Sequence, residues 1–326
     1  MAQHDIVVIG GSLGSTSVLK RVLAALPADL PASVFIATHL SSAGSGYLPG
    51  LLQDASALPV GGAVDRQTVE PGRVYVAVPN RHLLVINHEI VLGRGPRENM
   101  VRPAIDALFR SAAFAFGPRV IGVQLSGLLN DGASGLFAIK RRGGIAVVQH
   151  PVDAEAPDMP RAALEAVAAD HVAAADALGA LISELVYTEA AEPGRAPVEL
   201  ALEVEIAAGE GLGSARLRDI AEPVVHTCPH CAGVLSELKT AGPLRFRCQT
   251  GHAFTAEALA SAGDDAVREG IRVAMRLMEE RLDLVSKMAR DSRANGRDAV
   301  AELYERRARE YQGYSETLRR AATLSF

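Results

Sequence analysis

Two groups of residues in this 326-residue sequence have types and spacing that could do chemistry. The first is the pentapeptide Gly10-Gly11-Ser12-Leu13-Gly14, which follows a short β-branched run and precedes a helical stretch. In that context a G-x-S-x-G turn can lift a serine hydroxyl clear of the backbone as a nucleophile. The amides that open the next helix would face an oxyanion formed beside it. The turn could also cradle a phosphate or be a plain tight turn, although no dinucleotide or P-loop fingerprint is matched.

Two more polar side chains follow other predicted strands in the first half of the chain. His39 comes directly after the buried run 33–38, and Asp131 comes a few residues after the run 120–126. Parallel strands end at one edge of a sheet, so these side chains and Ser12 should meet there as base, orienting acid and nucleophile. Taken singly, the histidine could be structural and the Asp-Gly pair a turn. Their coincidence favours a catalytic triad.

The second group is a cysteine and histidine cluster in the last third of the chain. A C-x2-C pair is followed after sixteen residues by a C-x3-H pair, and the four members are Cys228, Cys231, Cys248 and His252. Three thiolates and one imidazole can close a tetrahedron around zinc. With four protein ligands no position stays open, so one structural zinc per chain is predicted and no cofactor for catalysis. A redox dithiol is the alternative, and His230 is a second, geometrically poorer nitrogen ligand.

The elements that must position the first group alternate between apolar strands and helices. This order predicts an α/β fold, a doubly wound and mostly parallel sheet with helices on both faces. Two short strands at 75–78 and 83–86 are expected to form a β excursion. The other expected strands lie at 5–9, 33–38, 120–126 and 145–149, and the helices at 17–26, 103–116, 133–142, 162–168 and 177–185.

The character of the chain changes near residue 189. We expect a catalytic domain over 1–188, a Pro- and Gly-containing linker over 189–226 and a zinc-ribbon-like module over 227–259. Strands at 234–237 and 244–247 would form the hairpin of that ribbon. Apolar residues at steps of three and four over 264–326 predict an α-helical hairpin or short coiled coil. Such a hairpin is most simply a packing element, and it is compatible with a homodimer.

Composition excludes several classes of protein. Apolar residues make up 48% and charged residues 22% of the chain, which is typical of a globular protein. The net charge of −5 and the few cations of the ribbon argue against nucleic-acid binding. No apolar run approaches the ~20 residues of a membrane span, and no signal peptide is visible. Clustered cysteines without a disulfide framework favour the cytoplasm.

Several separated motifs over residues 5–186 resemble the catalytic domain of the chemotaxis protein-glutamate methylesterases, the CheB family. They are I-G-G-S-L-G at 9–14, T-H-L at 38–40, V-A-V-P-N-R-H-L at 76–83, N-M-V-R-P-A-I-D-A-L-F at 99–109, G-V-Q-L-S-G-L-L-N-D-G-A-S-G-L at 122–136 and D-M-P-R-A-A at 158–163. The resemblance implies a serine attack on the methyl ester of a receptor glutamate, with release of methanol. By motif, the catalytic roles fall on Ser12, His39 and Asp131.

The resemblance also suggests roles for residues around the triad. The backbone N–H of Leu13 could serve an oxyanion hole, and Leu128 stands where the family has an oxyanion-hole methionine. Asn99, Arg102 and Asp106 are retained. Arg102 is a candidate for positioning substrate or bracing the site, unless it is an ordinary surface arginine, and Asn99 is grouped with it as an oxyanion or substrate residue.

The sequence is compatible with three functions. The leading one is a serine esterase acting on methylated signalling proteins such as chemoreceptors. A non-catalytic scaffold that keeps the fold is the second, favoured by the changed residues beside Ser12 and at 128–129. A protein-glutamine deamidase using the same triad is the third. Because the sequence starts at the first strand of the catalytic domain, we expect no receiver domain, so that any control would come from elsewhere.

Overall fold

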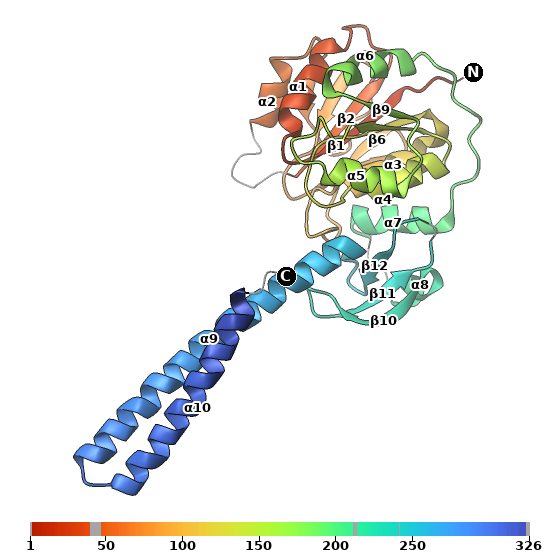
Figure 1. The fold of residues 1–326 in the computed structure, drawn as a ribbon. Coiled ribbons are helices and arrows are strands. Elements are labelled where there is room, and N and C mark those ends of the chain that lie inside the picture. The colour runs from red at the N-terminus through yellow and green to blue at the C-terminus, as the bar shows by residue number, and fades with distance from the viewer. Residues whose placement is uncertain (1, 40–46, 211–213, 241, 324–326) are drawn as a thin grey trace. The chain divides into compact units, whose positions relative to one another are not determined.

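The computed structural model describes residues 2–39, 47–210, 214–240 and 242–323. The chain forms two compact units, Met1–Leu259 and Ala260–Phe326. The first unit holds a large parallel sheet with its helices and a smaller antiparallel sheet (Figure 1). The second unit holds helices alone among its described residues.

Seven parallel strands form the main sheet in the order β3-β4-β2-β1-β7-β8-β9. The five inner strands are short and largely buried apolar segments, as the sequence predicted, whereas the two edge strands are only partly buried. The strands are β1 (Ile6–Gly11), β2 (Ser33–Thr38), β3 (Val60–Gly62), β4 (Arg73–Val76), β7 (Val120–Gln124), β8 (Ile145–Gln149) and β9 (His171–Ala173). The order reverses at β1, which lies between β2 and β7, and sheets of this kind place their binding sites at such a switch point.

Alternate side chains of each strand fill two separate cores. Along β1, Val7 and Ile9 belong to one core, and Ile6 and Val8 belong to the other. Helices α1 (Ser15–Ala25), α2 (Leu48–Gln53) and α6 (Ala175–Leu185) cover the first face. Helices α3 (Ile105–Phe116), α4 (Ala133–Arg141) and α5 (Asp158–Ala166) cover the second face (Figure 1). The predicted doubly wound α/β fold is confirmed.

The region 60–93 differs in part from the expectation. The strand predicted at 75–78 is β4, and it joins the main parallel sheet beside β2 rather than a separate excursion. Its apolar residues are buried on both faces, which is what a central strand requires. The second predicted strand is β5 (His82–Ile86), which pairs with β6 (Glu89–Gly93) in a two-stranded antiparallel sheet.

The segment 189–226, predicted as a linker, is largely ordered structure. It contains α7 (Val198–Ala208), α8 (Ser214–Ile220) and β10, which extends to Thr227. Helix α7 packs against α3 and buries Leu200, Glu203 and Ala207. Most of the prolines and acidic residues that suggested a linker lie at the ends of these elements or are exposed, whereas the inner face of α7 carries apolar residues and the buried Glu203.

The ribbon module is a four-stranded antiparallel sheet in the order β10-β11-β12-β13. The two predicted strands are β11 (Val234–Leu238) and β12 (Arg245–Cys248), and they pair as expected. Strands β10 (Ala221–Thr227) and β13 (Ala253–Thr255) extend the hairpin on either side.

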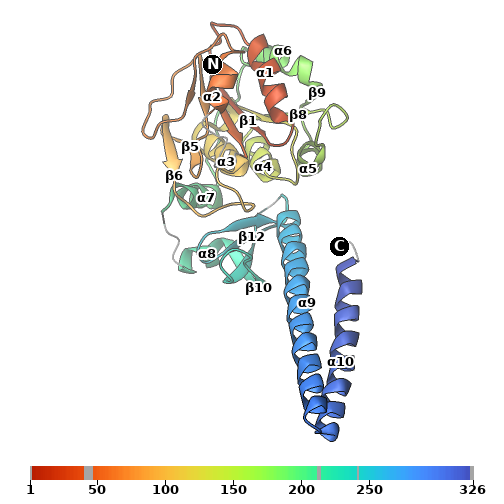
Figure 2. The same ribbon diagram turned by 90° about the vertical axis from the view of Figure 1, so that its left-hand side faces the viewer.

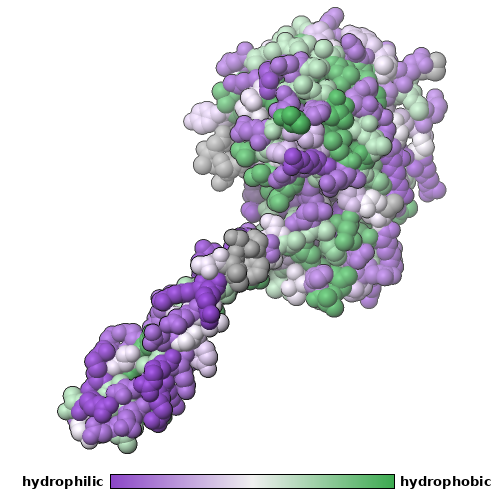
Figure 3. Space-filling view, in the orientation of Figure 1, coloured by the Kyte–Doolittle hydropathy of each residue, from purple (hydrophilic) through white to green (hydrophobic). Residues whose placement is uncertain are grey.

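Helices α9 (Ala256–Ala294) and α10 (Asp298–Thr323) lie side by side and antiparallel, as both ribbon views show (Figures 1 and 2). Two ion pairs join their flanks, Arg293 with Glu305 and Arg319 with Glu279. The surface of this hairpin that faces the viewer in Figure 3 is mostly hydrophilic. No helix in the described part of the chain is long and apolar enough to cross a membrane.

Candidate active site

Ser12 lies in a tight turn between β1 and α1. Its N–H donates to the carbonyl oxygen of Ser126 at 2.8 Å, and the Ser126 hydroxyl donates to the carbonyl of Leu13, also at 2.8 Å. Gly14 adopts a left-handed conformation with φ of 78°, so the chain can turn directly into the helix. Ser126 therefore fixes this turn from the end of the neighbouring strand. The sequence reasoning missed this role, although a serine at the end of a buried strand was a signal for it.

His39 and Ser12 begin adjacent loops at the same edge of the sheet. Gly11 and Thr38 are paired in the parallel register of β1 and β2, and each candidate residue comes next in the chain. His39 Nε2 lies 2.7 Å from Asp131 Oδ2, so the ring donates to the carboxylate through Nε2 and keeps Nδ1 for proton transfer. Between Ser12 and His39 the structure shows no hydrogen bond, which is common for a catalytic pair without substrate.

Asp131 is a buried carboxylate with several donors. Besides His39, it accepts the N–H of Ile105 at 2.7 Å, the N–H of Asp106 at 3.2 Å and the side-chain amide of Asn99 at 3.0 Å. Burial alone would raise its pKa, but the hydrogen bond and charge of His39, together with these donors, hold the pKa below the ordinary value. The carboxylate is thus kept ionised, as an acid that orients a histidine must be.

Asp106 lies beside Asp131 and is equally buried. Its Oδ1 accepts the N–H groups of Gly132 at 3.1 Å and Gly135 at 2.6 Å, at the start of α4. Burial and the neighbouring carboxylate of Asp131 raise its pKa from 3.8 to about 7. Two adjacent buried carboxyls with opposite pKa shifts hold one negative charge more easily than two.

Asn99 and Arg102 serve the site indirectly in this structure. The Asn99 side chain is buried and donates to both Asp131 and Asp106, an arrangement that favours positioning over the direct oxyanion or substrate contact suggested by the sequence. The Arg102 guanidinium donates to Asn80 Oδ1 and to the carbonyl of Gly95 at 2.7 Å. Of the two roles that the sequence left open for Arg102, this geometry favours bracing.

The two candidate oxyanion residues line the serine turn. Leu13 and Leu128 are about half exposed, and neither backbone N–H has an acceptor among the described residues. A Cβ on Gly127 would lie 2.9 Å from Ser12 Cβ and 2.2 Å from Met159 Sδ. Only glycine therefore lets the loop that carries Leu128 approach the serine so closely.

An open cavity of about 390 Å³ adjoins His39. Its wall includes Pro79, Asn80, Arg97, Met100, Val101, Arg102 and Pro103. The cavity is large enough for an extended side chain, and its charged wall residues, Arg97 and Arg102, are cationic.

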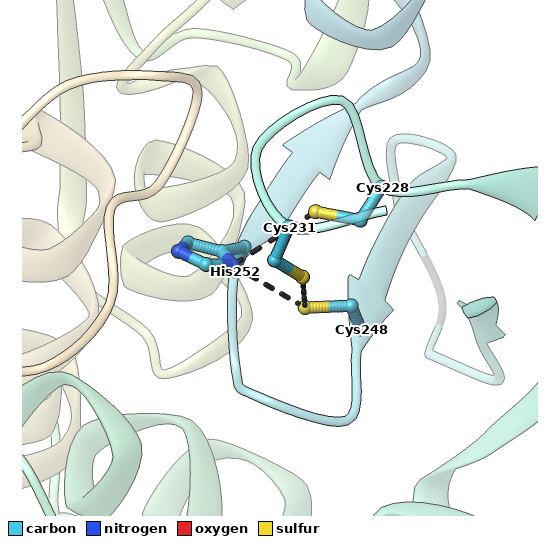
Figure 4. A group of neighbouring side chains, drawn as sticks. All are labelled: Cys228, Cys231, Cys248 and His252. Carbon is cyan, nitrogen blue, oxygen red and sulfur yellow. Dashed lines mark hydrogen bonds between the residues drawn. The ribbon is translucent and has the colours of Figure 1, made fainter. Parts of the chain in front are cut away.

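The four predicted metal ligands also come together (Figure 4). Their ligand atoms all lie within 4.8 Å of one another, with Cys231 Sγ 3.7 Å from Cys248 Sγ and His252 Nδ1 3.4 Å from Cys248 Sγ. The sulfur separation is far too long for a disulfide. It is close to the ~3.8 Å edge of a tetrahedron with ~2.3 Å zinc–sulfur bonds. His230 is outside this group of atoms, so the residues present fit one tetrahedral metal ion.

An α/β domain with a serine, a histidine and an aspartate at the carboxyl edge of its parallel sheet is the class of protein that this geometry defines. The chain belongs to the CheB methylesterase family, which its residues 7–182 match. The family and enzyme class predicted from the motifs are confirmed.

Known proteins similar to this chain share the same region. A putative protein-glutamate methylesterase/protein-glutamine glutaminase of Leptospira interrogans is 36% identical over 183 residues, which are 56% of this chain and 95% of that protein. A protein-glutamate methylesterase/protein-glutamine glutaminase of Nitratidesulfovibrio vulgaris is 33% identical over 188 residues, 51% of its length. The crystal structure of the Thermotoga maritima CheB methylesterase catalytic domain superposes with a TM-score of 0.54 at 31% identity, covering 57% of this chain and all of that one.

Proposed function

We propose that this protein hydrolyses glutamate methyl esters on signalling proteins of the chemoreceptor type through Ser12, His39 and Asp131. The observation that carries the proposal is the His39–Asp131 hydrogen bond at the end of β2, directly beside β1, the strand that Ser12 follows. The family membership and the names of the similar proteins support the reaction class.

In the first half of the reaction, Ser12 Oγ attacks the ester carbonyl carbon while His39 Nδ1 takes the hydroxyl proton. Asp131 stabilises the imidazolium that forms. The negative charge on the former carbonyl oxygen would be met by the N–H groups of Leu13 and Leu128. The carbon–oxygen bond to the methoxy group then breaks, and His39 returns the proton so that methanol leaves.

In the second half, water attacks the acyl-serine. His39 removes a proton from the water, the new tetrahedral intermediate collapses, and the serine oxygen leaves with the proton from His39. The products are a glutamate carboxylate and the free enzyme. The cationic wall of the adjoining cavity, with Arg97 and Arg102, is suited to a substrate segment that carries negative charge.

Deamidation of glutamine is a second candidate function because the similar proteins carry both activities in their names. The same triad would attack an amide carbonyl and release ammonia in place of methanol. Glutamine differs from the methyl ester in its leaving group alone, so both reactions fit one site.

The first test is methanol release from methylated receptor cytoplasmic fragments by wild type and by the Ser12→Ala variant. We expect release that Ser12→Ala abolishes, and loss of about 10³-fold or more in His39→Ala. If no methanol is released, fluorophosphonate labelling of Ser12 distinguishes an active enzyme given the wrong substrate from a protein whose Ser12 is not nucleophilic. A wild type that neither releases methanol nor labels would support the scaffold alternative and reject the esterase.

We also propose that Cys228, Cys231, Cys248 and His252 bind one structural zinc ion. The Thr250 hydroxyl lies 3.0 Å from Cys248 Sγ and 3.3 Å from Cys231 Sγ, where it can donate to bound thiolates. Such a site needs reduced cysteines, which favours a reducing compartment.

Metal analysis of the purified protein checks this site. We expect about one zinc per chain in wild type and in His230→Ala, and a marked loss in Cys231→Ser. Zinc-free protein with all three thiols freely titratable would contradict the proposal.

A further inference from the structure

We propose that the ribbon is a working part of the active site: its last strand positions Asp131 through Asn99 and Asn130, so that metal binding in the ribbon maintains the catalytic geometry. The inference rests on the proposed function of the triad and adds Thr255 as a positioning residue. It predicts that the esterase responds to the metal state of a module outside the catalytic domain.

Strand β13 lies directly against the segment that carries Asn99. The Ala253 N–H donates to the carbonyl of Arg97 at 3.3 Å, and the Asn99 N–H donates to the carbonyl of Ala253 at 2.8 Å. The Thr255 N–H then donates to the side-chain oxygen of Asn99 at 2.9 Å. Both the backbone and the side chain of Asn99 are therefore held by the ribbon.

The orientation of Asn99 matters because its amide nitrogen donates to Asp131 Oδ1. With its oxygen bonded to Thr255, the amide can only present its nitrogen to the carboxylate. Asn99 and Met100 both have positive φ, 49° and 68°. Non-glycine residues adopt this region at a cost, so the conformation depends on such contacts around it.

A second connection runs from Thr255 to Asn130, the residue before Asp131. The Thr255 hydroxyl donates to Asn130 Oδ1 at 2.7 Å, and the Asn130 amide donates to Glu257. Asn130 directly precedes Asp131 in the loop. The same hydroxyl accepts the Ala258 N–H at 3.2 Å, so Thr255 also caps the first turn of α9.

Two of the four candidate metal ligands lie at the start of β13. Cys248 is the last residue of β12, and His252 directly precedes β13. The Cys248 N–H donates to the carbonyl of His252 at 3.0 Å, closing the turn between the two strands. A metal bound by both residues would lock this turn and, through it, the register of Ala253 and Thr255 against Asn99.

A buried ion cluster fixes the ribbon to the same segment. Arg247 of β12 pairs with Glu98, the residue before Asn99, at 3.2 Å, and Arg110 of α3 pairs with the same carboxylate. The side chains of all three residues are at most 3% exposed. A shift of the ribbon would therefore move Glu98 and Asn99 with it.

The first experiment compares Thr255→Val, which keeps the shape and loses the hydroxyl, with Thr255→Ser, which keeps the hydroxyl. We expect Thr255→Val to lower kcat about tenfold and to leave KM within about twofold. Thr255→Ser should restore most of kcat. Val225→Ala, at a 95% exposed position on β10, is the ribbon control and should match wild type. A fully active Thr255→Val variant would overturn the positioning role.

The second experiment removes the metal with a chelator, restores it with Zn²⁺, and follows both Ser12 labelling and backbone hydrogen exchange. We expect metal removal to slow labelling at least about tenfold, and to lower protection at 97–101 and 127–132 while β1 stays protected. Zn²⁺ should reverse both effects. Labelling and protection that do not change on metal removal would refute the coupling.

The two proposals fail in different ways. If the metal-loaded wild type neither releases methanol nor labels, the esterase proposal fails, while hydrogen exchange still reports whether the metal orders the Asn99 segment. If wild type labels but is indifferent to metal, the esterase stands and the coupling is rejected.

Discussion

Single side chains decide the electrostatics of this site. Asp131 and Asp106 are neighbours with the same chemistry, yet the pKa of the first is lowered and that of the second is raised to about 7. The difference follows from their partners: His39 donates to Asp131, whereas Asp106 mainly accepts neutral backbone N–H groups. The charge is thus placed where the proposed mechanism uses it.

This pair predicts how stability depends on pH. With a pKa of 3.8 unfolded and about 7 folded, Asp106 keeps its proton in the folded state between these values and loses it in the unfolded state. The free energy of unfolding should therefore fall as pH rises from about 4 to 7, by up to ~1.4 kcal/mol per pH unit, and then level off. The lowered pKa of Asp131 acts only below about pH 4, outside this window.

Denaturant unfolding at pH 5, 6, 7 and 8 measures this effect. Asp106→Asn carries no titrating group and should flatten the pH dependence of the free energy of unfolding between pH 5 and 7. Asp176→Asn, at an exposed carboxylate paired with Arg21, is the control. An equal slope in wild type and Asp106→Asn would show that Asp106 is ionised in the folded protein.

At the scale of elements, two strand ends and their loops must meet closely. The turn after β1 carries Ser12, and the loop after β7 carries Leu128; Gly127 is where they touch. Ser126 reinforces the contact through its bonds to the backbone of the Ser12 turn. The position of Ser12 relative to Leu128 therefore depends on how closely these two loops pack.

Substitution of Gly127 tests that packing. Gly127→Ala places a Cβ within 2.9 Å of Ser12 Cβ, which must push the two loops apart. We expect kcat for methanol release to fall about 10²-fold with a smaller change in KM. Gly61→Ala, where a Cβ meets open space in strand β3, should leave the kinetics unchanged. Wild-type kinetics in Gly127→Ala would show that the loops relax without loss of geometry.

For the whole molecule, the notable feature is that the ribbon and the catalytic domain form one compact unit. Glu203 of α7 is buried between them and pairs with Arg110 of α3 and with Arg245 and Arg247 of β12. Burial opposes its charge, but these three guanidinium groups hold its pKa well below the ordinary value. The Glu203 carboxylate thus joins α7, α3 and the ribbon at one point.

Removal of this carboxylate should destabilise the unit strongly. Glu203→Ala leaves buried arginines without their partner, and we expect a loss of about 3–5 kcal/mol in the free energy of unfolding. Glu199 lies on α7 like Glu203, and it forms a partly exposed ion pair with Arg141 of α4. Glu199→Ala removes this pair and should lower the free energy of unfolding by at most about 1 kcal/mol. Chemical denaturation followed by circular dichroism compares the two. Similar losses in both variants would contradict the central role of Glu203.

The arrangement of helices in the second unit follows from local pattern. Apolar side chains recur at steps of three and four, and helices α9 and α10 have the predicted antiparallel order around the Asn295-Gly296 turn. Several apolar residues of the hairpin stay exposed, among them Leu277, Leu284 and Leu303. A homodimer through these helices stays a prediction.

The sequence by itself determined the fold class, the family and the composition of both candidate sites. Strands buried on both faces appear in the sequence as continuous apolar runs. The pairs of metal ligands appear as residues three or four positions apart. Both patterns are local, so the sequence alone reveals them. The strand order then brings Ser12, His39 and Asp131 to one edge, because parallel strands end on the same side of a sheet.

Only the tertiary structure decided how these parts depend on one another. Residues 189–226 were predicted to be a linker because their prolines and acidic residues are visible in the local sequence. The packing of α7 on α3 depends on a distant segment, and no local sequence pattern indicates it. Asn99 read as a substrate residue because nothing nearby in the sequence marks its partners: Thr255 lies 156 residues away and Asp131 lies 32. Contacts between distant segments leave no periodic pattern in the chain, and those contacts are what join the ribbon to Asp131 through Asn99.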